Sequence, residues 1–335
     1  MSQRDIERGF QLMSEAVVKL QEELGTSFYD AYIENLENFL DGQQARVIEG
    51  VPNQETVAYL NERYQELSQL SLSSEEKRKV EQLLLLQGIR KEPVQANHQL
   101  TPDSLGYLFV YMIESLMHNQ KDIRIADLMV GTGNLLATVL ANLETPEDGL
   151  KGYGVDVDET LLSISAVNQE WLDLDVQLFH QDSLQPLLMD PVDVAIGDLP
   201  IGYYPHDERV KEFKVSVAEG HTYAHHLLLE QSMKYVRDSG YGVFLMPTNF
   251  LETEQAGQIK TWLMSDVYLQ AIVKLPDALF SQKSLSKSIV IFQNHGAAAE
   301  QAKEIFVADL VSMKDNDIVL NFIKEFKSWR EANIK

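Results

Sequence analysis

Cysteine is missing from all 335 residues of the sequence. Without thiols the chain can form neither disulfides nor iron–sulfur clusters, and zinc sites with thiolate ligands are excluded as well. Apolar runs long enough to span a bilayer are also lacking, and the polar residues 1–10 do not resemble a secretion signal. These absences predict a cytoplasmic protein with no segment in a membrane.

Basic residues are scarce. Lysine and arginine total 28 against 51 aspartates and glutamates, which gives a net charge of −23, and the one short basic run is residues 77–79. A protein that binds duplex DNA by itself needs a basic face to displace counterions from the phosphates. We therefore expect any nucleic-acid binding to depend on a partner protein that supplies the contacts.

Residues 1–95 show helical periodicity and no strand pattern. Apolar residues recur every three or four positions in four successive segments, which predicts amphipathic helices. Ser73 followed by Glu76 is a capping box that predicts the start of the fourth helix. We interpret the apolar stripes as the core of a small helical domain. The alternative is a surface for a partner or for a second copy of the chain.

Short apolar runs alternate with helical stretches after residue 120. This alternation is typical of right-handed crossovers in a mostly parallel sheet that helices cover on both faces. We predict an α/β, Rossmann-like domain over residues 96–335, with a last helix at Asn321–Ile334 that caps the sheet. The seven candidate strands are Ile123–Leu128, Gly152–Asp156, Val176–His180, Val192–Gly197, Tyr241–Pro247, Tyr268–Leu275 and Ser288–Phe292.

The first candidate strand leads into a glycine-containing turn. Two glycines let the backbone turn tightly and approach a ligand without interference from Cβ atoms. The third glycine of a dinucleotide fingerprint is replaced by Leu136, which argues against a nicotinamide or flavin enzyme. An aspartate at the end of the strand suits the ammonium group of S-adenosylmethionine. The predicted cofactor contacts here are Asp127, Gly131, Thr132, Gly133 and Asn134.

Acidic residues also end the second and third candidate strands. Asp156 lies 23 residues after Gly133, where a carboxylate can accept hydrogen bonds from ribose hydroxyls. Val157 is expected to pack on one face of the adenine ring. Asp182, followed by Ser183, is expected to accept from the exocyclic amine. Because these features follow successive strands in order, they predict an S-adenosylmethionine site.

After the fourth candidate strand stands Asp198-Leu199-Pro200-Ile201. This tetrapeptide resembles the Asp/Asn/Ser-Pro-Pro-aromatic motif of N6-adenine DNA methyltransferases, particularly the modification subunits of type I restriction systems. Thr101-Pro102, Leu275–Phe280 and Ser288–Phe292 also resemble segments of that family, so the likeness covers about residues 97–295. Within it the sequence looks most like a YtxK-like branch of Gram-positive bacteria. The resemblance implies a seven-stranded class I methyltransferase sheet, with Thr101 beside the methionine moiety of S-adenosylmethionine.

The resemblance also implies how an amine would be methylated. An exocyclic amine on adenine is a poor nucleophile because its lone pair is delocalised into the ring. Asp198 would accept one amine proton with its side chain, and Leu199 would accept the other with its backbone carbonyl. Pro200 would stiffen the loop by fixing its own φ. Positioning and electrostatics then account for the rest of the catalysis.

The last residue of the tetrapeptide departs from the family pattern. Ile201 cannot provide the aromatic surface on which a flipped base stacks. Tyr203 or Tyr204 would replace that surface, or both tyrosines line a turn that ends at Pro205. Two other functions therefore stay open: a cofactor-binding protein that acts through a partner without catalysis, and a methyltransferase for an amine in RNA, protein or a small molecule.

Two further segments have alternative interpretations. His221 and His225 have the i, i+4 spacing of metal ligands, but helix capping or core packing is favoured for them and for His226. No metal is expected. The polar residues 282–288 contact phosphate or, as we favour, form a solvated connection between strands.

Overall fold

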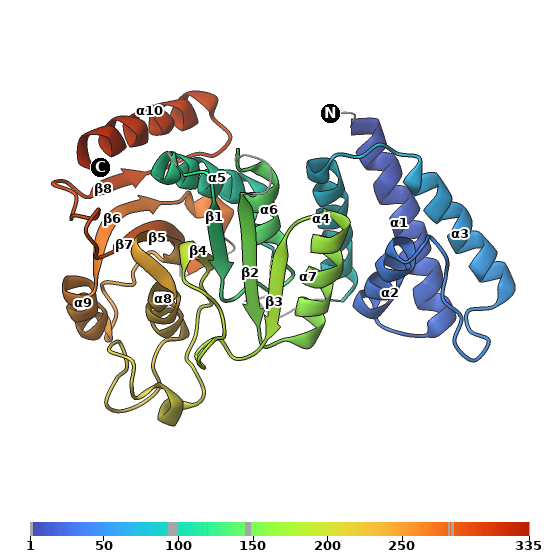
Figure 1. The fold of residues 1–335 in the computed structure, drawn as a ribbon, viewed down its shortest axis with the longest axis horizontal. Coiled ribbons are helices and arrows are strands. Elements are labelled where there is room, and N and C mark those ends of the chain that lie inside the picture. Colours follow the sequence, from blue (N-terminus) through green and yellow to red (C-terminus); the bar gives the residue numbers. More distant parts are fainter. Residues whose placement is uncertain are drawn as a thin grey trace.

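Four helices form the N-terminal part of the molecule, as the periodicity predicts. The computed structural model describes residues 3–92, 100–118, 120–144, 149–280, 282 and 285–334. The helices are α1 (Gln3–Leu24), α2 (Phe28–Leu40), α3 (Gln54–Ser68) and α4 (Ser74–Lys91). Figure 1 shows them grouped at one end of the molecule, beside the sheet. The predicted domain boundary at residue 95 lies outside the described residues.

Polar side chains determine where three of these helices begin. Ser27, Asn53 and Ser73 are N-cap residues whose side chains accept hydrogen bonds from backbone N–H groups in the first turn. The predicted capping box is present. The Glu76 N–H donates to Ser73 Oγ at 3.3 Å, and the Ser73 N–H donates to Glu76 Oε2 at 3.0 Å. The start of α4 is therefore encoded locally.

The apolar stripes of these helices pack into a common core. Leu12, Val17, Tyr32 and Leu84 are buried there, and Trp171 at the end of α7 (Glu159–Trp171) belongs to the same cluster. α2 also packs along α7. The stripes thus form the core of the helical domain and its junction with the sheet domain, which agrees with the first interpretation.

The second part of the chain folds around one mixed sheet. Its strands, in the described part of the chain, follow the order β3-β2-β1-β4-β5-β7-β6-β8. All neighbouring pairs are parallel except those that β7 makes with β5 and β6, which are antiparallel. This confirms the predicted α/β methyltransferase fold. The strands are β1 (Ile123–Asp127), β2 (Leu150–Asp156), β3 (Val176–His180), β4 (Val192–Asp198), β5 (Val236–Pro247), β6 (Val267–Lys274), β7 (Lys287–Asn294) and β8 (Phe306–Asp309).

The predicted number of seven strands needs a correction, because the described residues contain an eighth, β8, at the edge beside β6. β8 has four residues, and Val307 within it is 73% exposed. The sequence has an apolar run there, residues 305–308, but a run of four residues is too short to be distinguished from a loop or a short helical segment by its pattern alone.

Helices cover both faces of this sheet (Figure 1). Residues of α5, α6 and α10 share one apolar core with the sheet, and residues of α8 and α9 share the other. α10 begins before the predicted Asn321, because the Asp315 side chain caps it by accepting from two backbone N–H groups. None of the helices described is long and apolar enough to cross a membrane. Their bounds are α5 (Asp103–Met117), α6 (Asn134–Asn142), α8 (Ala224–Lys234), α9 (Ala256–Ser265) and α10 (Asn316–Asn333).

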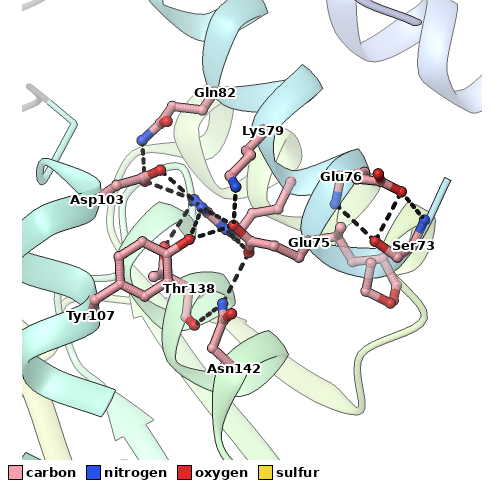
Figure 2. A network of polar contacts seen from close by, with 12 residues as sticks. Ser73, Glu75, Glu76, Lys79, Gln82, Asp103, Tyr107, Thr138 and Asn142 are labelled. Carbon is pink, nitrogen blue, oxygen red and sulfur yellow. Dashed lines mark hydrogen bonds and ion pairs between the residues drawn. The ribbon is translucent and has the colours of Figure 1, made fainter. Parts of the chain in front are cut away.

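A buried arginine joins the two parts of the molecule. The Arg78 guanidinium is 1% exposed and donates to the carboxylates of Glu75 at 2.7 Å and Asp103 at 2.8 Å. It also donates to Thr138 Oγ1 at 3.2 Å. Figure 2 shows the side chains of this network meeting between α4, α5 and α6. Burial alone would raise the pKa of Glu75, but the hydrogen bonds from Arg78 and Tyr107 outweigh it and lower that pKa to about 2.

Replacing Arg78 with methionine is expected to reduce the free energy of unfolding by about 3 kcal/mol. The substitution keeps the aliphatic volume but leaves the carboxylates of Glu75 and Asp103 beside each other without their shared cation. The expected loss of stability is at the low end of the range for a broken buried ion pair, because the side chains of Glu75 and Asp103 are 15% and 27% exposed. Urea denaturation of the full chain measures the change.

The matched control is Arg46→Met on the surface of the helical domain. Arg46 is 53% exposed and pairs with Glu34 and Glu37. Losing an exposed pair is expected to change stability by less than about 1 kcal/mol. Equal losses for the two variants would contradict the assigned role of the buried network.

Candidate functional site

A cavity of about 710 Å³ opens at the carboxyl ends of the central strands. The strand order reverses between β1 and β4, which is where ligands of open α/β sheets bind. Most of the residues predicted from the sequence line it: Thr101, Asp127, Gly131, Thr132, Asn134, Asp156, Val157, Asp182, Ser183, Asp198, Pro200, Ile201, Tyr203 and Tyr204. Gly133 and Leu199 do not belong to the lining.

The two glycines of the turn have different surroundings. Both have positive φ, +53° at Gly131 and +80° at Gly133, so both need glycine. A Cβ at Gly131 would meet nothing within 4 Å, whereas a Cβ at Gly133 would lie 2.6 Å from the Gln169 amide nitrogen on α7. Gly131 therefore leaves room on the open side of the loop, and Gly133 allows the loop to pack against α7.

Asp156 links the glycine turn to the end of β2. Its Oδ2 accepts from the Gly131 N–H at 2.8 Å, and its Oδ1 accepts from the Asp158 N–H at 2.9 Å. Val157 stands beside it with 69% of its surface exposed, although it is apolar. A carboxylate next to an exposed apolar side chain suits a nucleoside, which presents ribose hydroxyls and a flat ring.

Asp182 is engaged by the loop that follows β4. Its Oδ1 accepts from the Leu184 N–H at 3.0 Å, and its Oδ2 accepts from the Tyr204 hydroxyl at 2.6 Å. Arg209 lies 3.6 Å from the same oxygen. Burial and the Asp182 carboxylate raise the pKa of Tyr204 to about 12. Tyr204 therefore faces the predicted cofactor residues, whereas Ser183 donates its hydroxyl hydrogen to the Leu128 carbonyl.

Asp127 is 2% exposed at the end of β1. Its Oδ1 accepts from the Met129 N–H at 3.0 Å. Burial raises the pKa of Asp127 to about 8, and the nearby carboxylates of Asp156 and Asp198 act in the same direction. Burial therefore favours the neutral form of this carboxyl group, and a cationic ligand would favour its ionised form.

Asp198 and the Leu199 carbonyl converge on one nitrogen atom. The Lys287 ammonium donates to Asp198 Oδ1 and, at 2.9 Å, to the Leu199 carbonyl oxygen. The Thr101 hydroxyl donates to Asp198 Oδ2 at 3.1 Å, and Asn134 donates to the Thr101 carbonyl at 2.8 Å. The two groups predicted to accept amine protons therefore lie within hydrogen-bond reach of one nitrogen, which here belongs to the side chain of Lys287.

Lys287 lines the cavity, and no pattern in the sequence predicted it there. The polar residues 282–288 suggested a phosphate contact or a solvated connection. Lys283 and Ser284 lie outside the described residues, but the Lys287 side chain is only 15% exposed and turns inward. Because β7 is antiparallel, its first residue lies at the carboxyl edge of the parallel strands, beside Pro247. If β7 had been predicted to run antiparallel, its first residue would have been expected at this edge of the sheet, next to the site.

Tyr203 and Tyr204 point to different parts of the site. The Tyr203 ring is 52% exposed and stacks on Tyr223, with centroids 4.8 Å apart and planes inclined by 11°. Both hydroxyls donate to Glu254. Tyr203 therefore presents a supported aromatic surface at the cavity, close in sequence to Ile201, where the family has its aromatic residue.

The histidines lie behind this aromatic stack. His225 and His226 are buried, and burial lowers the pKa of His225 to about 3 and that of His226 to about 4, so both rings are neutral. His221 is exposed and lies 3.0 Å from Asp207. Within the ranges that the structure covers, no cluster of three or more histidine, aspartate or glutamate side chains is arranged to hold a metal ion.

Comparisons with known proteins match both parts of the chain. The model of the N-6 DNA Methylase family matches residues 85–329, and that of the YtxK N-terminal helical domain matches residues 7–89. The uncharacterized protein YtxK of Bacillus subtilis (strain 168) is 33% identical over 320 residues, which cover 96% of each chain.

Solved structures also match nearly the whole chain. A Listeria monocytogenes protein, provisionally described as a class I S-adenosylmethionine-dependent methyltransferase, has a TM-score of 0.89 and 35% identity, covering 98% of this chain and 99% of its own. The methyltransferase subunit of a type I restriction-modification system from Streptococcus thermophilus has a TM-score of 0.66 and 11% identity, covering 95% of this chain and 74% of its own. At that identity the second likeness concerns the fold alone.

Proposed function

We propose that this chain, which belongs to the N-6 DNA methylase family, transfers a methyl group from S-adenosylmethionine to an amino nitrogen. The observation that carries the proposal is the convergence of Asp198 and the Leu199 carbonyl on a single nitrogen atom, that of Lys287. Two acceptors on one nitrogen are what a primary amine needs if both of its N–H groups are to be bonded while its lone pair is used. Asp198 and Lys287 line the same cavity as the predicted cofactor residues.

The residues around the cavity fit S-adenosylmethionine. Asp127 would accept from its ammonium group, Asp156 from its ribose hydroxyls and Asp182 from its exocyclic amine, while Val157 would pack on the adenine ring. The exposed side chain of Val157 and the space in front of Gly131 support this arrangement, because both lie at the cavity, where a nucleoside would cover them. When bound, S-adenosylmethionine supplies an electrophilic methyl group.

The chain's own residues would prepare the acceptor amine. Asp198 Oδ1 and the Leu199 carbonyl each accept one N–H group, which draws the lone pair out of conjugation with a purine ring. Thr101 keeps Asp198 oriented through its other oxygen. Asp198 is also placed to accept the proton that the nitrogen loses once it has been methylated. Catalysis then depends on positioning and on a carboxylate aimed at developing positive charge.

Adenine is the acceptor that the family suggests, and Tyr203 is the residue we propose to stack on it in place of Ile201. Stacking on an aromatic side chain contributes about 1–3 kcal/mol per base. Glu254 and Tyr223 hold the ring of Tyr203 in position. With a net charge of −23, the chain is expected to need a partner protein to engage duplex DNA, so an adenine in RNA or a smaller acceptor is tested alongside DNA.

A second candidate function is cofactor binding without catalysis. Two observations favour it, and the first is that the position for an acceptor amine is filled by Lys287. The second is that Ile201 stands where the family has an aromatic residue for stacking on a base. Such a protein would bind S-adenosylmethionine and signal through a partner.

Tritiated methyl transfer separates the two candidates. The full chain is incubated with methyl-labelled S-adenosylmethionine and, separately, with DNA, RNA and cell-extract protein. Label in an amine of one pool, identified by hydrolysis and chromatography, supports methyl transfer. Binding of S-adenosylmethionine by calorimetry with no label in any pool supports the second candidate, and failure to bind it contradicts both.

Replacing Asp156 by alanine is expected to raise the dissociation constant for S-adenosylmethionine at least about tenfold, since a charge-assisted hydrogen bond contributes about 1.5–3 kcal/mol. The variant also loses the bond to the Gly131 N–H. Asp156→Asn keeps an oxygen for that N–H and isolates the effect on the ribose. Calorimetry measures the dissociation constants of both variants. The control is Asp190→Ala, because the Asp190 side chain is 79% exposed. Unchanged affinity in the Asp156 variants would remove the ribose assignment.

A further inference from the structure

The nitrogen of Lys287 occupies the position that an acceptor amine would need. It donates to both members of the acceptor pair, Asp198 Oδ1 and the Leu199 carbonyl oxygen. Lys287 is also the only lysine or arginine among the described residues that line the cavity. With 15% exposure, its ammonium is largely withdrawn from solvent, so these two bonds are its main compensation for lost hydration.

We propose that Lys287 is a specificity-determining residue, which holds the acceptor position in the free protein and withdraws only for a nitrogen that can replace both of its hydrogen bonds. The inference rests on the proposed function and goes further, because it states what the acceptor must displace. Two nitrogens cannot share one position, so acceptor binding and the Lys287 contact exclude each other.

Selectivity for the acceptor follows from the hydrogen bonds that are exchanged when the acceptor group replaces the Lys287 ammonium. A primary amine brings two N–H donors and satisfies both Asp198 and the Leu199 carbonyl. A carbonyl oxygen brings no donor and would face both acceptors with lone pairs, so it cannot replace the ammonium. A lysine side chain can make way readily, because its flexible four-carbon stem allows the ammonium to swing while the backbone stays paired at the start of β7.

The test is a calorimetric titration of 2′-deoxyadenosine into the full chain, saturated with S-adenosylhomocysteine so that the probe cannot enter the cofactor part of the cavity. Lys287→Ala removes the occupant, and we expect it to bind deoxyadenosine at least about tenfold more tightly than the natural chain, given the strength of charge-assisted hydrogen bonds. Deoxyinosine, which carries oxygen in place of the amine, is expected to gain nothing.

Two variants serve as controls. Lys287→Arg keeps a cation on Asp198 and is expected to bind deoxyadenosine as weakly as the natural chain. Lys274→Ala removes a 45% exposed lysine from the end of the neighbouring strand β6, where it pairs with Asp309, and is expected to change nothing. If Lys287→Ala fails to fold, judged by thermal melting, Lys287→Met removes the ammonium and keeps the stem.

The proposal is overturned if the Lys287 variants bind deoxyadenosine no better than the natural chain, or if deoxyinosine gains as much. Failure of S-adenosylhomocysteine to bind would instead contradict the proposed function. The same titration without it would still report on Lys287, so the two failures are distinguishable.

Discussion

Replacing Asp198 with alanine is expected to lower the rate of methyl transfer about 100–1000-fold, the range seen when a preorganised electrostatic contact to the reacting group is removed. Affinity for S-adenosylmethionine should change little, because Asp198 lies at the end of β4, beside the proposed acceptor position and not among the residues proposed to contact the ribose and the adenine. The measurement is single-turnover methyl transfer, with calorimetry for cofactor affinity.

Asp198→Asn separates the effect of the charge from the effect of the hydrogen bond. The amide keeps an oxygen that can accept one N–H but loses the charge that stabilises a nitrogen becoming cationic. An intermediate rate is therefore expected, above that of the alanine variant. Asp190→Ala, at an exposed position, controls for the loss of a carboxylate. Full turnover in Asp198→Ala would refute the acceptor role of this side chain and leave Leu199 without a partner in the mechanism.

Asp127→Asn is expected to make stability less dependent on pH. The folded protein holds the pKa of Asp127 at about 8, while the usual value is 3.8. Between these values the unfolded chain is ionised and the folded chain is protonated, so the Asp127 contribution to stability is fully present below about pH 4 and is lost as pH rises to about 8. Each unit of pKa corresponds to about 1.4 kcal/mol, so a shift from 3.8 to about 8 corresponds to roughly 6 kcal/mol in total.

The asparagine variant has no carboxyl group to ionise, yet its oxygen can still accept from the Met129 N–H. Its advantage in unfolding free energy over the natural chain should therefore be small near pH 4 and grow up to about pH 8. Urea denaturation at several pH values follows the difference, and Asp190→Asn provides the matched exposed control. Parallel pH profiles for the natural chain and Asp127→Asn would contradict the raised pKa.

Much of the fold follows from patterns that act over short distances. Apolar periodicity located α1–α4 and seven of the strands, and the Ser73–Glu76 capping box marked the first turn of α4. The same alternation of strands and helices implied parallel strands whose carboxyl ends share one edge. This alternation predicts that Asp127, Asp156, Asp182 and Asp198 lie at one edge of the sheet, and the resemblance of the tetrapeptide adds the role expected of Asp198.

The rest of the site depends on contacts between distant segments. Lys287 reaches Asp198 across 89 positions in the sequence, and it does so only because β7 runs antiparallel and delivers its first residue to the cavity. The side chains of the adjacent Tyr203 and Tyr204 also point in different directions. Tyr204 bonds to Asp182, whereas Tyr203 stacks on Tyr223. Side-chain direction of this kind depends on loop geometry, which carries no periodic signal.

The amino-acid sequence by itself indicated the four N-terminal helices, seven of the strands along the chain and the row of aspartates at strand ends, because propensity, capping and hydrophobic periodicity are local properties. Tertiary structure alone decided that Arg78 joins the two parts, that burial shifts Asp127 away from its ordinary ionisation, and that Lys287 bonds to both Asp198 and the Leu199 carbonyl. Each of those outcomes depends on which groups are brought together out of water, and desolvation and charge pairing exist only once the chain has folded.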